Sequence, residues 1–176
     1  TPDGPMVETE AILLWLAERH GALAPSVGSS QRAGFLKWLF FASNTLHADL
    51  RMLFYPQTYI GPDPVQQRQL QQVQRQRLQE HLTNLETAAE DQLPWLGGDD
   101  PSVLDLYLAC QLRWMALYPQ ACDRSWMTLQ QYPHLYHLCA KLELRPSVLA
   151  ACRAEGLGPT PFTSPILATP PEGSAT

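Results

Sequence analysis

The first twenty residues read TPDGPMVETEAILLWLAERH (residues 1–20), and this stretch decides how we interpret the rest of the chain. Pro5-Met6-Val7 is predicted to be a short extended strand, and Glu8-Thr9 to begin a helix with acidic residues in its first turn. The helix over 11–17 is apolar on every side, so it needs cover on more than one face. A strand needs a neighbour for its backbone donors and acceptors, and no other strand is predicted downstream. We therefore expect the partner sheet to lie upstream of Thr1 and the chain to be a fragment.

The order of a short strand, Glu8-Thr9 and an apolar helix resembles the end of the thioredoxin-like domain of cytosolic glutathione transferases. The resemblance implies that Glu8 pairs with the α-ammonium of the γ-glutamyl group of glutathione and that Thr9 adds a hydroxyl donor. Backbone N–H groups and the dipole at a helix start favour the α-carboxylate of the same group. The alternative is that Thr9 only caps the helix and that Glu8 only complements its dipole.

Composition predicts a helical protein of one domain, or of one domain and a fragment, with 176 residues available to build a core. A net charge of −5 argues against a general nucleic-acid binder, and no apolar run is long enough for a membrane span. The four cysteines form no CxxC pair and have no histidine at metal-ligand spacing, so we expect reduced thiols and no metal. The expected location is the cytoplasm.

Apolar periodicity predicts helix after helix downstream of a linker at 22–30. The helix over 31–55 carries an apolar face made of Phe35, Leu39, Ala42, Leu46, Leu50 and Leu53. Pro56 is expected to end this helix and 57–64 to form a loop. The helix over 65–91 is expected to expose its Gln and Arg residues and to bury Val73, Leu78, Leu82, Leu85 and Ala89.

Further helices are predicted to begin at Ser102 and to span about 128–143 and 146–155. The pattern predicts a linker (22–30), a helical domain (31–156) and a disordered Pro-rich tail (157–176), and the resemblance implies that 1–21 is a remnant of a thioredoxin-like domain.

The helix start at Ser102-Val103-Leu104-Asp105 is a capping arrangement in which the Ser102 hydroxyl bonds the amide of Asp105 and the Asp105 carboxylate reaches back. Together with Pro94-Trp95-Leu96-Gly97-Gly98 before it, this segment resembles the helical domain of glutathione transferases, where the cap supports folding rather than catalysis. Tyr132-Pro133 and Arg145-Pro146 resemble the starts of that family's last two helices.

Three polar residues, Asn44, His47 and Arg51, share one face of the helix over 31–55, and Phe40 extends that face toward its N-terminus. In the resembled family this helix lines the substrate cleft. Asn44-Thr45-Leu46-His47 also looks like a bacterial beta-class pattern, in which the histidine approaches glutathione and a lysine follows. Ala48 stands here in place of that lysine. The alternative for His47 is an ordinary solvated or capped polar residue.

The resemblance implies an all-α helical bundle of the glutathione-transferase C-terminal type, with a truncated thioredoxin-like remnant at its N-terminus. The parent protein is expected to join the glutathione thiolate to a small hydrophobic electrophile and to form a homodimer. No catalytic residue is identified in this chain, because the family's thiol-activating residue lies in the thioredoxin-like domain. The chain alone is therefore expected to be inactive. Two alternatives remain: a related glutathione-dependent reaction, and a non-catalytic assembly module of the same fold.

Overall fold

The computed structural model describes residues 1–2, 4–91 and 93–170, and within these ranges it contains helices and no strand. The α-helices are α1 (Thr9–His20), α2 (Arg32–Phe41), α3 (Ala48–Phe54), α4 (Pro56–Ile60), α5 (Pro64–Glu90), α6 (Val103–Leu117), α7 (Pro133–Glu143) and α8 (Pro146–Glu155). A π-helical segment, η1 (Ala42–His47), joins α2 to α3, and a 3-10 turn, η2 (Leu129–Gln131), precedes α7. The predicted all-α class is confirmed.

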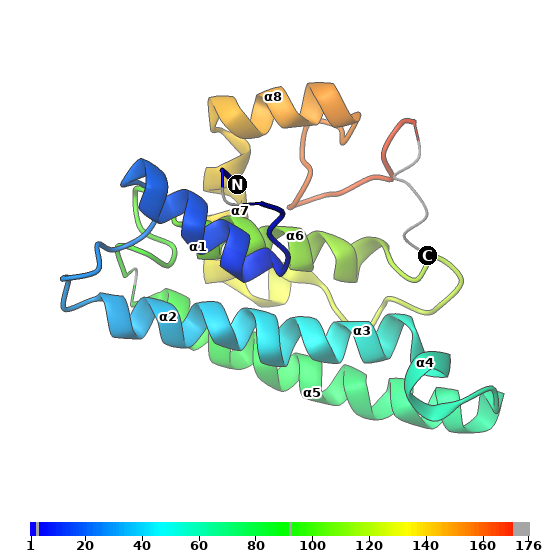
Figure 1. Cartoon of the computed structure of the whole chain (residues 1–176). Helices are drawn as coiled ribbons and strands as arrows, with labels where there is room; N and C mark the ends of the chain where they lie inside the picture. Colours follow the sequence, from blue (N-terminus) through cyan, green and yellow to red (C-terminus); the bar gives the residue numbers. More distant parts are fainter. Residues whose placement is uncertain (3, 92, 171–176) are drawn as a thin grey trace.

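Helix α6 lies in the middle of the molecule and contacts α1, α2, η1 and α7. The continuous rod α2–η1–α3 runs antiparallel to α5 along one side, and the short α4 turns the chain between them (Figure 1). Helix α8 lies on the other side of α6 (Figure 1). None of the helices in the described ranges has both the length and the apolar composition needed to cross a membrane.

The predicted helix over 31–55 is confirmed as a rod, and its whole apolar face is buried in the core. Two details differ from the prediction. The backbone hydrogen bonds change from the α-helical to the π-helical pattern across η1. Residues 56–60 form α4 instead of a loop. Pro56 ends α3 as predicted but also begins α4, because a proline at the first helical position loses no intrahelical hydrogen bond.

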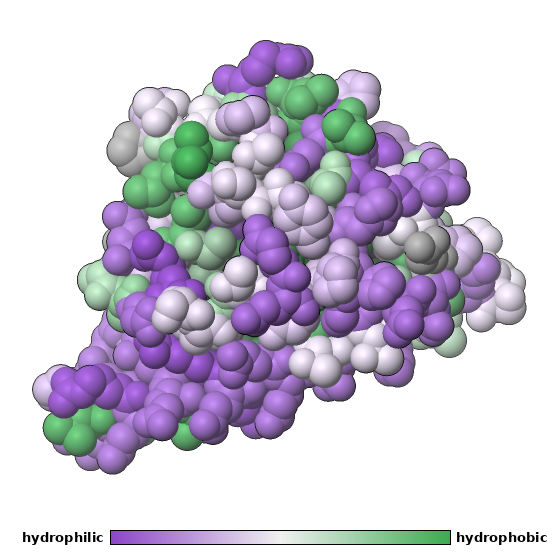
Figure 2. Space-filling model, turned by 180° about the vertical axis from the view of Figure 1, so that it is seen from behind, coloured by the Kyte–Doolittle hydropathy of each residue, from purple (hydrophilic) through white to green (hydrophobic). Residues whose placement is uncertain are grey.

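Helix α5 confirms the burial of Leu78, Leu82, Leu85 and Ala89, whereas Val73 is 51% exposed, so its predicted burial is wrong. Gln74 takes the inward position and is 5% exposed. The reason is helical spacing, since Gln74 lies four residues before Leu78 and Val73 lies five. Figure 2, seen from behind, shows a largely hydrophilic surface along this lower side of the molecule, as predicted for the Gln- and Arg-rich face.

The N-terminal segment corrects another prediction, because residues 5–7 form no strand in the structure. Their side chains are exposed, and α1 buries fully only Ala17 while Leu13 and Leu14 pack partly against the core. The helix start after Glu8 is confirmed. The assignment of 1–21 to a thioredoxin-like domain stays a prediction.

The predicted disorder of 157–176 is wrong for 157–170, which pack against α6, α7 and α8, while 171–176 lie outside the described residues. Two charged side chains hold this segment. The Glu143 carboxylate accepts hydrogen bonds from Phe162 N (2.9 Å), Thr163 N (2.8 Å) and the Thr163 hydroxyl (2.8 Å). Arg113 donates to the carbonyls of Pro161 (3.1 Å) and Ile166 (2.9 Å). The Pro-rich composition therefore does not prevent order, because side chains of the helical body satisfy the segment's backbone groups.

Candidate functional site

A cavity of about 540 Å³ lies where the N-terminus of α1 meets the rod α2–η1–α3. Helices α1, α3, α4 and α6 and segment η1 contribute to its wall. The lining residues are Glu8, Thr9, Glu10, Ser43, Asn44, His47, Ala48, Arg51, Tyr59 and Tyr107. The cavity thus brings together five of the six residues that the sequence predicted for ligand binding, from segments more than thirty residues apart.

Glu8 and Thr9 stand at the start of α1 with side chains that are not used for capping. Glu8 occupies the N-cap position, its side chain makes no capping hydrogen bond, and Thr9 is the first helical residue. The alternative of a simple Thr9 cap therefore does not match the geometry. The backbone of Glu8 has φ 70° and ψ 118°, a region that residues other than glycine rarely occupy. Such strain clusters at ligand-binding sites, where the surrounding structure enforces it.

Segment η1 carries Asn44 and His47 on a turn wider than that of an α-helix. Its first carbonyl, that of Ala42, accepts a hydrogen bond from the side-chain amide of Gln111 on α6 (3.1 Å), and Gln111 is fully buried. π-Helical turns are uncommon and occur frequently at functional sites. The buried amide therefore stabilises the irregular turn from which the polar residues reach the cavity.

His47 is held from one side by two aromatic residues of α6. Its Nδ1 lies 2.7 Å from the Tyr107 hydroxyl, and the ring packs 5.4 Å from the Trp114 ring, centroid to centroid. Burial lowers the pKa of His47 below its usual value of 6.5, and the nearby Arg51 lowers it further. Burial also raises the pKa of Tyr107 to about 12. At neutral pH the pair is therefore a neutral imidazole and a protonated phenol.

Phe40 is the predicted pocket residue that the structure does not place in the cavity wall; its side chain is 46% exposed. Phe40 precedes η1, and the wider turn changes the angle between residues before it and residues after it. Arg51 lines the cavity, and within the described residues it makes no ion pair of 4.0 Å or less.

Several lining residues were not predicted, and their signals in the sequence differ. Glu10 and Ser43 neighbour predicted residues, so a search along the same helix turns would have found them. Tyr59 was missed because its segment was predicted to be a loop, and Tyr107 because it comes from α6, far along the chain. A contact between distant helices leaves no spacing pattern in a single sequence.

The predicted structural cap at Ser102 and Asp105 is confirmed and lies apart from this cavity. The Ser102 hydroxyl accepts from Leu104 N (3.0 Å) and Asp105 N (3.4 Å) and donates to Trp95 O (2.8 Å). The Asp105 carboxylate accepts from Ser102 N (2.7 Å) and Gly97 N (3.0 Å). Both residues are buried, so this arrangement joins the 94–98 loop to the start of α6.

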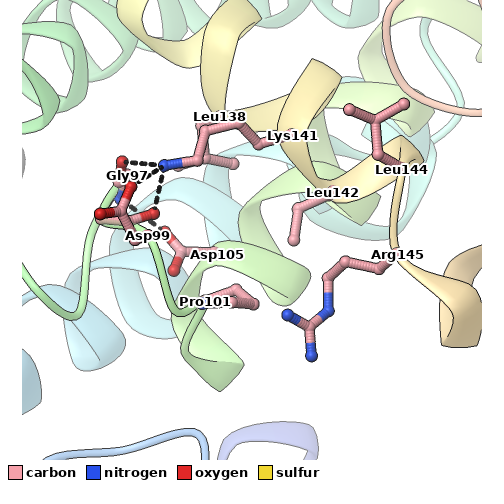
Figure 3. A pocket seen from close by; sticks show the side chains of 10 residues that line it. Gly97, Asp99, Pro101, Asp105, Leu138, Lys141, Leu142, Leu144 and Arg145 are labelled. Carbon is pink, nitrogen blue, oxygen red and sulfur yellow. Dashed lines mark hydrogen bonds and ion pairs between the residues drawn. The ribbon is translucent and has the colours of Figure 1, made fainter.

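A smaller cavity of about 230 Å³ opens beside Asp105, between the 97–101 loop and the end of α7 (Figure 3). Lys141 reaches across and donates to Gly98 O (2.6 Å) and Gly97 O (3.3 Å), and it pairs with Asp99 at 3.2 Å (Figure 3). The ammonium group of Lys141 thus holds the loop against α7, a role in folding.

Comparison with known proteins agrees with these features. Residues 63–140 match the family model of the glutathione S-transferase C-terminal domain. The solved ternary complex of BphK, a bacterial glutathione transferase, is 30% identical to the chain, with a TM-score of 0.68 over 88% of this chain and 70% of that one. A sphingomonad glutathione S-transferase complexed with glutathione is also 30% identical, with a TM-score of 0.66 over 87% of this chain and 69% of that one.

A bacterial beta-class glutathione S-transferase from Sphingomonas chungbukensis is 28% identical, with a TM-score of 0.64 over 85% of this chain and 67% of that one. A search of curated proteins found no match. The fold class is that of the helical domain of bacterial glutathione transferases. The chain belongs to the glutathione S-transferase family.

Proposed function

We propose that the cavity at the start of α1 binds the γ-glutamyl end of glutathione and that the protein takes part in glutathione-dependent chemistry. The observation that carries this proposal is the pair Glu8 and Thr9. Both line the cavity, neither side chain caps the helix, and the backbone of Glu8 is held in a strained conformation. A relative 30% identical to the chain is described as complexed with glutathione, which supports the choice of ligand.

The roles proposed for the cavity residues follow from their charge. The Glu8 carboxylate pairs with the ligand ammonium, and the Thr9 hydroxyl donates to the ligand carboxylate beside the positive end of the α1 dipole. Asn44, His47 and Arg51 line the part of the cavity formed by the rod, where a second, electrophilic substrate would meet the sulfur. The proposed reaction is transfer of the thiolate to a small hydrophobic electrophile by a cytoplasmic homodimer.

The family resemblance places the thiol-activating residue in the thioredoxin-like domain, near its start, and not among the helices that line this cavity. We therefore expect the 176-residue chain alone to show no conjugation of glutathione with an aryl halide. A spectrophotometric assay of the purified chain measures this. Turnover at the level of a complete glutathione transferase would contradict the expectation.

Calorimetric titration with glutathione tests the ligand assignment. Thr9→Ala should weaken binding about tenfold because it removes a donor to a charged group, while Thr9→Ser should retain most of the affinity. Glu8→Gln should weaken binding more at low salt than at high salt, since it removes an ionic contact. Glu10→Gln is the matched control, because it removes a carboxylate from the same cavity without touching the proposed pairing. Unchanged affinity in both Glu8→Gln and Thr9→Ala would contradict the assignment and favour a non-catalytic assembly module.

A further inference from the structure

The wall of the cavity at the start of α1 contains charges of both signs, and they come from different segments. The carboxylates of Glu8 and Glu10 lie at the start of α1, whereas Arg51 comes from α3. Arg51 is the one described lining residue with a permanent positive charge. In the part of the chain that the structure describes, no ion pair within 4.0 Å joins Arg51 to a carboxylate. Its guanidinium group is therefore available to an anion that enters the cavity.

The sequence and packing of α3 explain why Arg51 has no acidic partner on its own helix. The acid of α3 is Asp49, two residues before Arg51, and side chains two residues apart on a helix do not face each other. Asp49 is buried against α5, where its Oδ2 accepts a hydrogen bond from Arg77 Nε (2.9 Å) and lies 2.8 Å from His81 Nε2. Asp49 therefore holds α3 against α5, while Arg51, on a different face of α3, lines the cavity.

Tyr59 adds an aromatic surface to the same cavity wall. It lies on α4, which contacts both α3 and α5, and it is 45% exposed. Such a ring can stack on a flat ligand, and the planar guanidinium of Arg51 can bind both oxygens of a carboxylate at once. Arg51 and Tyr59 together therefore suit an aromatic ring that carries a carboxylate. The glycyl end of glutathione also has a carboxylate, but it offers no ring to Tyr59.

We propose that the second substrate of this cavity is an aromatic carboxylate, and that Arg51 selects it by binding its carboxylate group. The inference rests on the proposed function for the reaction, because it names the class of electrophile that glutathione would meet. The charge of Arg51 acts within the cavity, since it lowers the pKa of the lining residue His47 further than burial alone does. The electrophile then has an apolar ring that packs on Tyr59 and one anionic end held by Arg51.

Two probes of the same shape test this selection by charge without any reaction. The carboxylate of para-nitrobenzoate is replaced in para-nitrobenzamide by an uncharged amide. In a ¹H–¹⁵N NMR titration of the labelled chain at neutral pH, the parent should bind the benzoate about fivefold more tightly than the amide. Arg51→Gln, a change of an exposed side chain, should bind both probes alike.

Arg68→Gln is the matched control, because Arg68 is exposed on α5 and does not line the cavity. This variant loses the same charge and should keep the preference for the benzoate. Equal binding of the two probes by the parent would overturn the proposal, and this comparison needs no variant. A preference that survives in Arg51→Gln, or that is lost equally in Arg68→Gln, would also overturn it.

Titrations with glutathione decide whose carboxylate Arg51 binds. If it binds that of the second substrate, Arg51→Gln should keep the glutathione affinity of the parent. Weaker binding of glutathione but not of γ-glutamylcysteine, which lacks the glycyl end, would assign Arg51 to the glycyl carboxylate and overturn the proposal. A parent that binds glutathione without preferring the benzoate removes this inference and leaves the proposed function standing. A parent that prefers the benzoate but binds no glutathione removes the proposed function, while the carboxylate site at Arg51 stands.

Discussion

Asp105→Ala is expected to lower the free energy of unfolding by about 3 kcal/mol, because it leaves the buried N–H group of Ser102 and the partly buried N–H group of Gly97 without their acceptor. Ser102→Ala should cost about 1 kcal/mol or somewhat more, as is usual for loss of an N-cap hydroxyl. The double variant should cost less than the sum, since both residues act on one network. Urea denaturation followed by circular dichroism measures all three.

Asp99→Ala is the control for the Asp105 prediction. Asp99 lies in the same loop, but its carboxylate is fully exposed, and among the described residues its ion-pair partner is Lys141. Such a surface pair contributes little, so Asp99→Ala should unfold at a urea concentration close to that of the parent. If Asp105→Ala unfolds at the same urea concentration as Asp99→Ala, the capping arrangement does not stabilise the fold.

The effect of Asp105 should also depend on pH. Burial raises the pKa of Asp105 from 3.8 to about 6, so the folded state binds this proton more tightly than the unfolded state. A group of this kind contributes most stability at low pH, and its contribution falls as the pH rises from about 4 to about 6. The stability difference between the parent and Asp105→Ala should therefore be larger at pH 4 than at pH 7.

Glu143→Ala should release residues 157–170 from the helical body. The substitution removes the carboxylate that accepts hydrogen bonds from two backbone N–H groups and one hydroxyl of this segment. The expected loss is about 3 kcal/mol, confined mainly to this segment because it follows the last helix. Hydrogen exchange at Phe162 and Thr163 and limited proteolysis measure the release. Glu155→Ala on the exposed side of α8 is the matched control and should leave both amides protected. Protected amides in Glu143→Ala would show that other contacts hold the segment.

The sequence predicts the helices well where one face is apolar over many turns. Leu46 and Leu50, or Leu82 and Leu85, recur at helical spacing, and local pattern is sufficient to place them in the core. The capping box is also readable, since its residues are only three positions apart. Glu8 and Thr9 were found through family resemblance, and His47 through helical spacing together with that resemblance; the structure places all three in one cavity.

The features that the sequence did not reveal depend on contacts between distant segments. Tyr107 reaches His47 from sixty residues away, and Glu143 orders a segment whose composition alone indicates disorder. Val73 was predicted to be buried because it is apolar, but the buried position of this helix turn is the next one, Gln74. In each case the outcome depends on which distant segments pack together. The residue pattern of a single sequence does not specify these contacts.

The π segment between α2 and α3 has a consequence for how related chains should be aligned. Such a turn is how a helix absorbs one inserted residue while the parts on either side keep their places, so 42–47 is where a relative could be one residue shorter. An alignment without gaps across this stretch would then pair His47 with a neighbour of its true counterpart. The register of this helix among relatives is best anchored separately on Phe35 and on Leu50.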